Sequence, residues 1–142
     1  MRDSRPARSS EPVTIYTDGG SRGNPGPAAI GGVVLRAGDT LEEFSAYVGE
    51  KTNNQAEYMA LLSGMERAAE FSDGDLTCYL DSELVVKQVT GAYKIKSAEL
   101  RKFIPQVKAL EERFRSVAYR HTYRERNARA DALVNRALDA RR

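Results

Sequence analysis

The hydrophobic pattern at the start of the chain alternates with a period of two, which is typical of strands. Residues 13–18, VTIYTD, alternate in this way and are followed by a pair of glycines. Two further β-prone runs, residues 29–37 and 40–49, are joined by Gly38 and Asp39, residue types that favour a tight reversal. The sequence therefore predicts that the chain begins as an antiparallel meander of three strands.

From Asn54 the pattern changes to the i, i+3, i+4, i+7 spacing of an amphipathic helix, which we expect to be capped by Asn53 or Asn54. A second alternating run, residues 76–81, is followed by a helical segment at residues 83–89 that stops at Gly91. This part of the chain therefore predicts a long helix, a strand and a short helix.

An apolar stripe over residues 100–114 again has helical spacing, but Pro105 lies inside it. Because proline removes a backbone donor and clashes with the preceding turn, we expect a kink or a break there. A strand at residues 116–123 and a helix at residues 127–138 complete the order β-β-β-α-β-α-α-β-α. This order predicts an α/β fold whose mixed five-stranded sheet, an antiparallel three-strand meander plus two parallel strands, has helices on both faces.

The length of 142 residues suits one domain with a continuous core. We place this domain at residues 13–142, because residues 1–12 have the Arg-, Ser- and Pro-rich composition of a disordered tail. No apolar run approaches the roughly 18 residues of a membrane span and no signal peptide is recognisable, so we expect a soluble, cytoplasmic monomer. The single cysteine, Cys78, is interpreted as a buried small hydrophobic residue.

The net charge of +2 indicates no partner by itself, but the charge is unevenly distributed. From Arg113 to the end of the chain there are nine arginines and three acidic residues. A basic C-terminal third of this kind fits either a surface that follows nucleic-acid phosphates or a solvated helix.

Four acidic residues stand where solvated acids are not expected. Asp18 and Asp81 each end a predicted strand, two residues after a tyrosine, and neighbouring strands about 4.8 Å apart would bring both to one end of the sheet. Glu57 and Asp131 lie in first helical turns beside the buried stripes. Clustered carboxylates repel unless a cation neutralises them, and such hard oxygen donors favour Mg²⁺. Two ions about 4 Å apart can support in-line cleavage of a phosphodiester.

Four motifs in sequence make the chain recognisable: YTDGGSRGNPGP, TNNQAEYMALLSGME, YLDSELVVKQVTG and RERNARADALVNRAL. Over residues 13–138 the chain resembles the type 1 ribonuclease H family. The resemblance implies the family's fold and its activity, hydrolysis of the RNA strand of an RNA/DNA hybrid to leave 3′-hydroxyl and 5′-phosphate ends. It also implies that a tetrad of carboxylates binds two Mg²⁺ ions, with Mn²⁺ as an alternative. In that tetrad Asp18 bridges both ions, Asp131 supports the ion that activates water, and Glu57 and Asp81 hold the other.

The glycine- and proline-rich turn after the first strand would let the backbone approach a sugar-phosphate chain closely. RNA is distinguished from DNA by its 2′-hydroxyl in the shallow minor groove, which requires short donors and acceptors. The resemblance implies substrate contacts at Gly19, Gly20, Ser21, Asn24, Thr52, Asn53, Asn54 and Glu83. Asn24 is also consistent with a turn residue before proline, and Asn53 with a helix cap.

Three features depart from the family pattern. The family's loop histidine, thought to help product release, has no counterpart, because the single histidine, His121, falls in the last predicted strand; Arg124 or Glu125 would take its place. The family's phosphate pocket keeps Thr52 but has Glu50 where an arginine is usual. The basic helical protrusion of some bacterial relatives is missing, so we expect weaker hybrid binding that depends strongly on salt.

Two other functions stay open from the sequence: a catalytically silent module that binds RNA/DNA hybrid or double-stranded RNA, and a related nuclease with a different substrate. A module that only binds gains nothing from clustered negative charge next to phosphates. The four carboxylates therefore favour an enzyme, with the RNA/DNA hybrid as its partner and no membrane association.

Overall fold

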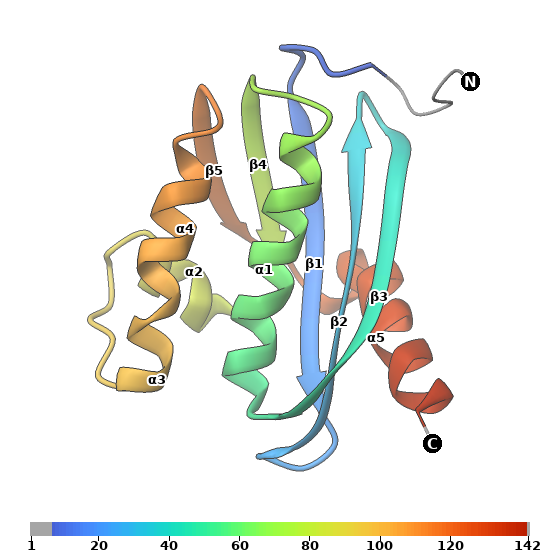
Figure 1. Ribbon diagram of the computed structural model, residues 1–142, viewed down its shortest axis with the longest axis vertical. Coiled ribbons are helices and arrows are strands. Elements are labelled where there is room, and N and C mark those ends of the chain that lie inside the picture. Colours follow the sequence, from blue (N-terminus) through green and yellow to red (C-terminus); the bar gives the residue numbers. More distant parts are fainter. Residues whose placement is uncertain (1–6, 142) are drawn as a thin grey trace.

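The computed structural model describes residues 7–141, and its centre is a five-stranded sheet (Figure 1). The strands are β1 (Val13–Ser21), β2 (Gly26–Arg36), β3 (Asp39–Lys51), β4 (Asp75–Leu80) and β5 (Ser116–His121). They lie in the order β3-β2-β1-β4-β5, in which the β1–β2 and β2–β3 pairs are antiparallel and the β1–β4 and β4–β5 pairs are parallel. The predicted meander and mixed sheet are confirmed.

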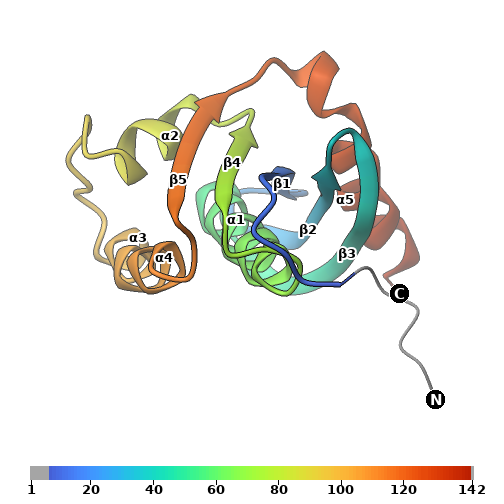
Figure 2. The ribbon, with the colours of Figure 1, turned by 90° about the horizontal axis from the view of Figure 1, so that it is seen from above.

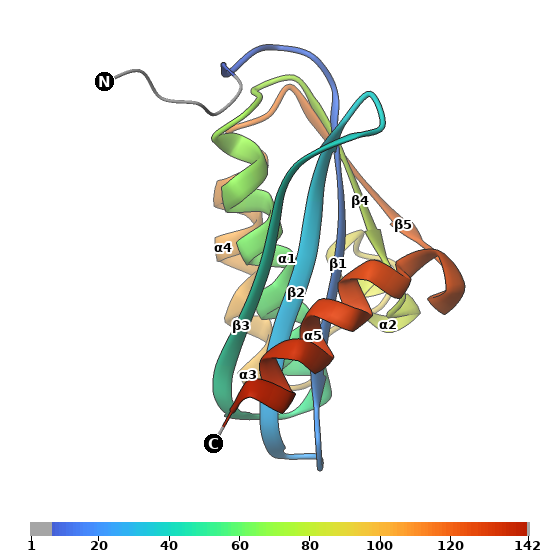
Figure 3. The same ribbon diagram turned by 90° about the vertical axis from the view of Figure 1, so that its right-hand side faces the viewer.

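Helices cover both faces of the sheet, with α1 and α4 on one face and α5 across β1, β2 and β3 on the other (Figures 2 and 3). The helices are α1 (Asn53–Ala69), α2 (Glu83–Val89), α3 (Ala98–Arg101), α4 (Phe103–Glu111) and α5 (Ala128–Ala140). A 3₁₀ turn, η1 (Arg124–Asn127), precedes α5. The predicted order of elements is confirmed, with the helical stripe divided between α3 and α4.

The division of that stripe lies shortly before its proline. α3 ends at Arg101, and α4 starts at Phe103, two residues before Pro105. In a continuous helix the nitrogen of Pro105 would have to donate to the carbonyl of Arg101, four residues earlier, and proline has no N–H to donate. The predicted break is therefore confirmed, and Phe103 and Val107 still face the core.

The core lies between α1 and the sheet. Tyr58 and Met65 of α1 are fully buried against Ile15 of β1 and Cys78 of β4. Tyr58 also stacks on Phe103 of α4, with 5.2 Å between ring centroids. Cys78 is the buried hydrophobic residue that was predicted, and burial raises the pKa of its thiol. This packing fixes the position of α1 over the centre of β1.

The N-terminus of α1 is capped by Thr52, so the predicted cap at Asn53 or Asn54 is wrong. The Thr52 hydroxyl accepts a hydrogen bond from the backbone N–H of Gln55 at 3.2 Å, and the Gln55 side chain accepts one from the backbone N–H of Thr52 at 2.9 Å. This reciprocal pair is a capping box, which satisfies two backbone donors at once. The Asn53 side chain is left available to bond elsewhere.

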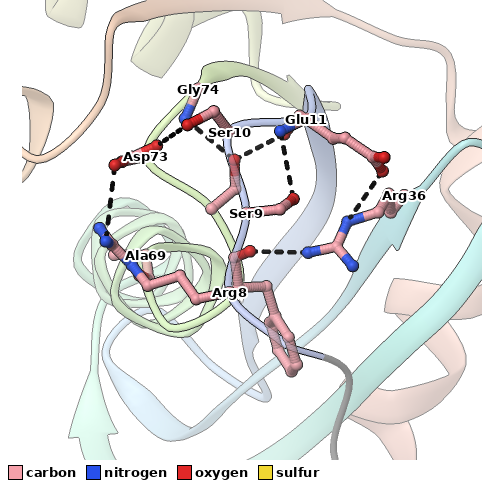
Figure 4. A network of polar contacts seen from close by, with 10 residues as sticks. Arg8, Ser9, Ser10, Glu11, Arg36, Ala69, Asp73 and Gly74 are labelled. Carbon is pink, nitrogen blue, oxygen red and sulfur yellow. Dashed lines mark hydrogen bonds and ion pairs between the residues drawn. The ribbon is translucent and has the colours of Figure 1, made fainter.

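Residues 8–11 are not the disordered tail that their composition suggested (Figure 4). The N–H of Ser9 donates to the carbonyl of Phe71 at 2.9 Å, and Nε of Arg8 donates to the carbonyl of Ala69 at 3.0 Å. Ala69 is the last residue of α1, where helix carbonyls lack partners within the helix, and Phe71 follows two residues later. The segment therefore supplies donors that the end of α1 requires.

A second group of contacts closes the same segment over the loop before β4 (Figure 4). The Ser10 hydroxyl donates to Oδ1 of Asp73 at 2.7 Å, and the Ser72 hydroxyl donates to the carbonyl of Glu11 at 2.5 Å. A Cβ on Gly74 would collide with the carbonyl of Ser10, so the close approach depends on this glycine. The packed domain thus includes part of the predicted tail, whose first six residues lie outside the described residues.

Candidate active site

The register of β1 and β4 brings two of the predicted carboxylates side by side. Thr17 pairs with Leu80, so Asp18 and Asp81 are the next residues on two parallel neighbours. Asp81 was predicted as the last residue of its strand and lies one residue after the end of β4. β1 continues to Ser21, so Asp18 lies inside a strand instead of at its end. β1 is longer than predicted because its last residues pair with the start of β2.

Helix α1 delivers the third carboxylate to the same point. One oxygen from each of Asp18, Glu57 and Asp81 lies within 4.8 Å of the other two. Oε1 of Glu57 also accepts a hydrogen bond from the N–H of Gly19 at 3.4 Å. Asp18 and Glu57 are only 6% and 8% exposed, so two of the three acids are buried.

Helix α1 can come this close to β1 because residue 19 has no side chain. A Cβ on Gly19 would collide with the carbonyl group of Ala56 and lie 2.6 Å from the backbone nitrogen of Glu57. The nearest atom to a Cβ on Gly20 would be a methyl of Val134, at 3.8 Å. Of the two glycines predicted as substrate contacts, the first therefore also admits the helix backbone that carries Glu57.

Gly19→Ala is accordingly expected to lower the free energy of unfolding by about 3 kcal/mol, because the colliding atoms are backbone and cannot move aside as a side chain could. Gly20→Ala is the matched control, with an expected change of about 0.5 kcal/mol or less. Urea unfolding of both variants measures the difference. Equal stability of the two variants would contradict the requirement for a glycine beneath α1.

The fourth carboxylate comes from α5, on the opposite face of the sheet. A Cβ on Gly31 of β2 would lie 2.7 Å from a backbone oxygen of α5, so the helix and the strand are in close contact. Asn127, which is 1% exposed, precedes the helix, and its Nδ2 donates to the carbonyl of Thr17 at 3.0 Å. These contacts hold the first turn of α5 against β1. Asp131 lines the same cavity as Asp18 and adds to the rise in the pKa of Asp18, but it is not among the three acids that lie within 4.8 Å of one another.

Crowding of acids at one buried point changes their proton affinities. Burial, reinforced by the Asp81 carboxylate, raises the pKa of Asp18 to about 7. Burial, together with Asp18 and Asp81, raises the pKa of Glu57 well above its usual value. Among the described residues, Oε2 of Glu57 is buried and has no hydrogen-bond partner. A buried acceptor without a donor, among carboxylates that are costly to ionise, fits a divalent cation held by hard oxygen ligands.

The acidic cluster opens into a surface cavity of about 480 Å³. Five of the eight predicted substrate positions line it: Gly19, Gly20, Ser21, Asn53 and Asn54. The other three do not line the cavity. Thr52 caps α1, Glu83 pairs with Lys87 at 2.9 Å on α2, and Asn24 bonds the backbone of a cavity residue instead.

Ser21, Asn24 and Asn53 join the glycine-rich turn to the start of α1. Oδ1 of Asn53 accepts from the N–H of Ser21 at 2.9 Å and from its hydroxyl at 3.2 Å, and the N–H of Asn53 donates to Oδ1 of Asn24 at 3.1 Å. The Ser21 hydroxyl also hydrogen-bonds the carbonyl of Gly23. Asn53 is therefore not a helix cap, because Thr52 has that role, and Asn24 does more than precede a proline, because its side chain bonds the backbone of Asn53.

The cavity contains residues that the sequence did not single out. Arg22, Tyr123 and Asn135 line it, and Arg124, which was predicted, does so as well. His121 is the last residue of β5, as expected for a strand residue, and it borders the cavity too. Arg22 and Asn135 lie inside two of the quoted motifs, but nothing in the sequence pairs them, because they are 113 positions apart and meet only in the folded chain.

Comparisons with known proteins agree with this geometry. A family model described as reverse transcriptase-like matches residues 16–137. The crystal structure of RNase H1 from Halobacterium salinarum NRC-1 has a TM-score of 0.88 and 44% identity, covering 92% of this chain and 99% of that chain. LC11-RNase H1, solved in complex with RNA/DNA hybrid, has a TM-score of 0.85 and 46% identity, covering 89% of this chain and 96% of that chain.

The mixed sheet with helices on both faces and the acidic cluster at its centre define the ribonuclease H class of fold and site. The chain belongs to the type 1 ribonuclease H family. A bifunctional protein of Mycobacterium tuberculosis is 43% identical over 130 residues, which are 90% of this chain. The chain spans only 36% of the length of that relative.

Proposed function

We propose that this protein hydrolyses the RNA strand of RNA/DNA hybrids and leaves 3′-hydroxyl and 5′-phosphate ends. The convergence of Asp18, Glu57 and Asp81 within 4.8 Å carries the proposal, and Asp131 lines the same cavity from the other face of the sheet. The scaffold is that of RNase H1 structures, one of which was solved with an RNA/DNA hybrid. Burial makes these acids harder to ionise, and a module that only binds nucleic acid would gain nothing from burying acids in this way.

The four carboxylates would hold two divalent ions, with Mg²⁺ as the expected metal and Mn²⁺ as the alternative. Asp18 would bridge both ions; Asp131 would hold one, and Glu57 and Asp81 the other. When bound, such a pair supplies an acidified water and stabilises charge on the leaving oxygen of an in-line displacement. The chain's own contribution is to fix the four carboxylates from three directions, through β1 and β4, α1 and α5.

Contacts to the hybrid would come from short polar groups around the cavity. Ser21, Asn53 and Asn54 line it and offer hydroxyl and amide groups of the kind that recognise a 2′-hydroxyl. Thr52 and Glu83 stay predicted contacts outside the cavity. Weak, strongly salt-dependent binding stays the expectation for a chain without a basic protrusion.

Product release would be aided by the loop before α5. Arg124 borders the cavity, and Glu125 is exposed in the same 3₁₀ turn. Both residues therefore stay candidates for the role of the family's loop histidine. Within residues 7–141 no helix combines the length and hydropathy needed to cross a membrane. The monomeric state and cytoplasmic location stay predictions.

The test is incubation of the protein with labelled RNA/DNA hybrid, duplex RNA and duplex DNA, each with MgCl₂, with MnCl₂ and with a chelator. We expect cleavage of the RNA strand of the hybrid only when a divalent ion is added, and products with 5′-phosphates. Hybrid that is bound but left intact would favour the silent binding module. Cleavage of duplex DNA in preference to hybrid would favour a related nuclease.

A further inference from the structure

A row of polar side chains on α5 connects the acidic cluster to the turn between β1 and β2. Asp131, Asn135 and Asp139 are spaced four residues apart, so they follow one face of the helix in successive turns. Nδ2 of Asn135 donates to Oδ2 of Asp131 at 3.3 Å and to the Asp131 backbone carbonyl at 3.1 Å. The amide of Asn135 is therefore in direct contact with a carboxylate of the site.

Arg22, the first residue after β1, reaches the same row from the turn. Its Nη2 donates to Oδ1 of Asn135 at 3.4 Å and to Oδ1 of Asp139 at 2.7 Å. The Arg22 backbone is also fixed, because its N–H donates to the carbonyl of Pro27 at 2.8 Å and its carbonyl occupies the space that a Cβ on Gly26 would need. The turn thus holds Arg22 in place towards α5.

The chemistry of these groups gives the chain of contacts a direction. An asparagine amide has one donor end and one acceptor end, and only the donor end can face a carboxylate without repulsion. Arg22, which can only donate, engages the oxygen end of Asn135 and leaves the nitrogen end for Asp131. We propose that Arg22 and Asn135 form a positioning relay: Arg22 orients the amide of Asn135, and Asn135 fixes the carboxylate of Asp131 beside Asp18.

The relay rests on the proposed function. It is expected to affect the orientation of the Asp131 carboxylate more than the stability of the fold. The side chains of Arg22 and Asp139 are 46% and 69% exposed, and ion pairs at such exposure contribute little to stability. A carboxylate that loses the amide donor of Asn135 is freer to rotate, which weakens its part in holding a cation. The glycine-rich turn would then serve catalysis through α5 as well as through substrate contact.

Asn135→Ala is expected to lower kcat on labelled RNA/DNA hybrid about five- to tenfold with KM changed less than twofold, because a charge-assisted hydrogen bond to Asp131 is lost and a hybrid contact is not. Without nucleic acid, the variant should need about three- to tenfold more MgCl₂ for half of the maximal rise in melting temperature. Asn135→Asp keeps the shape but only accepts, and should lose more. Asn135→Gln keeps an amide donor and should recover part of the rate.

Arg22→Ala is expected to lower kcat about two- to threefold in the wild-type background and to have no further effect in Asn135→Ala, because a residue that acts through another is not additive with it. Arg136→Ala is the control on the same helix, since Arg136 lines a different cavity beside β3. That control should retain the wild-type kcat and MgCl₂ midpoint.

Wild-type kcat and MgCl₂ midpoint in both Asn135→Ala and Asn135→Asp would overturn the relay. A loss in Arg22→Ala that appears in KM and multiplies with that of Asn135→Ala would overturn it too, and would assign Arg22 to the hybrid itself. If the wild-type protein cleaves no hybrid, the proposed function fails. The MgCl₂ comparison without nucleic acid still tests the relay in that case.

Discussion

Asp18→Asn is expected to reduce hybrid cleavage by roughly a thousandfold or more. Loss of a residue that only hydrogen-bonds a metal ligand typically lowers activity or metal affinity about 10–100-fold, and Asp18 would be a direct, bridging ligand. The substitution keeps the size of the side chain and removes its charge. It should therefore leave the fold intact and relieve the repulsion with Asp81 and Glu57. Cleavage of labelled hybrid in MgCl₂, followed over several orders of magnitude of enzyme concentration, measures the loss.

The matched control is Asp39→Asn, the same chemical change at an exposed position. Asp39 pairs with Arg36 at the turn between β2 and β3, which lies beside the start of β1 and away from the acidic cluster. Wild-type rate in Asp39→Asn and loss in Asp18→Asn would locate the effect in the cluster. Full activity in Asp18→Asn would refute the assignment of the site.

The sequence was a sufficient guide to the centre of the fold because the strongest local signals agree with the tertiary structure. Tyr16 and Tyr79, which marked Asp18 and Asp81 as equivalent, are paired in the β1–β4 register and stack with 4.8 Å between ring centroids. The period-two and helical patterns follow from burial of one face of each element, and burial is what the α1–sheet core requires. The break near Pro105 follows from backbone chemistry alone.

The errors have equally local causes. Both threonine and asparagine are good caps, and the signal that decides between them is the glutamine three residues after Thr52, which completes a capping box. The end of β1 was placed too early because Gly19 and Gly20 are typical of turns, whereas in the structure they remain in the strand. A glycine that admits a packed helix cannot be distinguished from a turn glycine by composition.

The contacts of the N-terminal segment and the Arg22–Asn135 pair were beyond the reach of the sequence. Residues 8–11 have no apolar periodicity, and their order comes from hydrogen bonds to the end of α1. Arg22 and Asn135 are polar residues at exposed positions, and they are in contact only because α5 crosses the sheet beside the turn. Polar contacts between distant surface elements leave no mark on hydrophobic periodicity.

Without a divalent metal, the acidic cluster is expected to make the protein less stable as the pH rises from about 4 to about 7. The pKa of Asp18 is about 7 in the folded protein, against an ordinary value of 3.8. Between these values the folded state keeps a proton that the unfolded chain releases, so raising the pH favours unfolding. The loss attributable to Asp18 is on the order of 2–4 kcal/mol and is complete above about pH 7.

Comparison with Asp18→Asn isolates this effect from the other titrating groups. In the presence of a chelator, the free energy of unfolding of the variant should exceed that of the wild type, and by an amount that grows from pH 5 to pH 8. At pH 8, MgCl₂ should stabilise the wild type and have little effect on the variant, because a bound cation offsets the repulsion among carboxylates only where all of them can ionise. Urea midpoints at both pH values, with chelator or MgCl₂, measure this. If, without metal, the wild type instead gained stability relative to Asp18→Asn as the pH rises, the raised pKa of Asp18 would be contradicted. The account of the cluster as a site that holds positive charge would then fail with it.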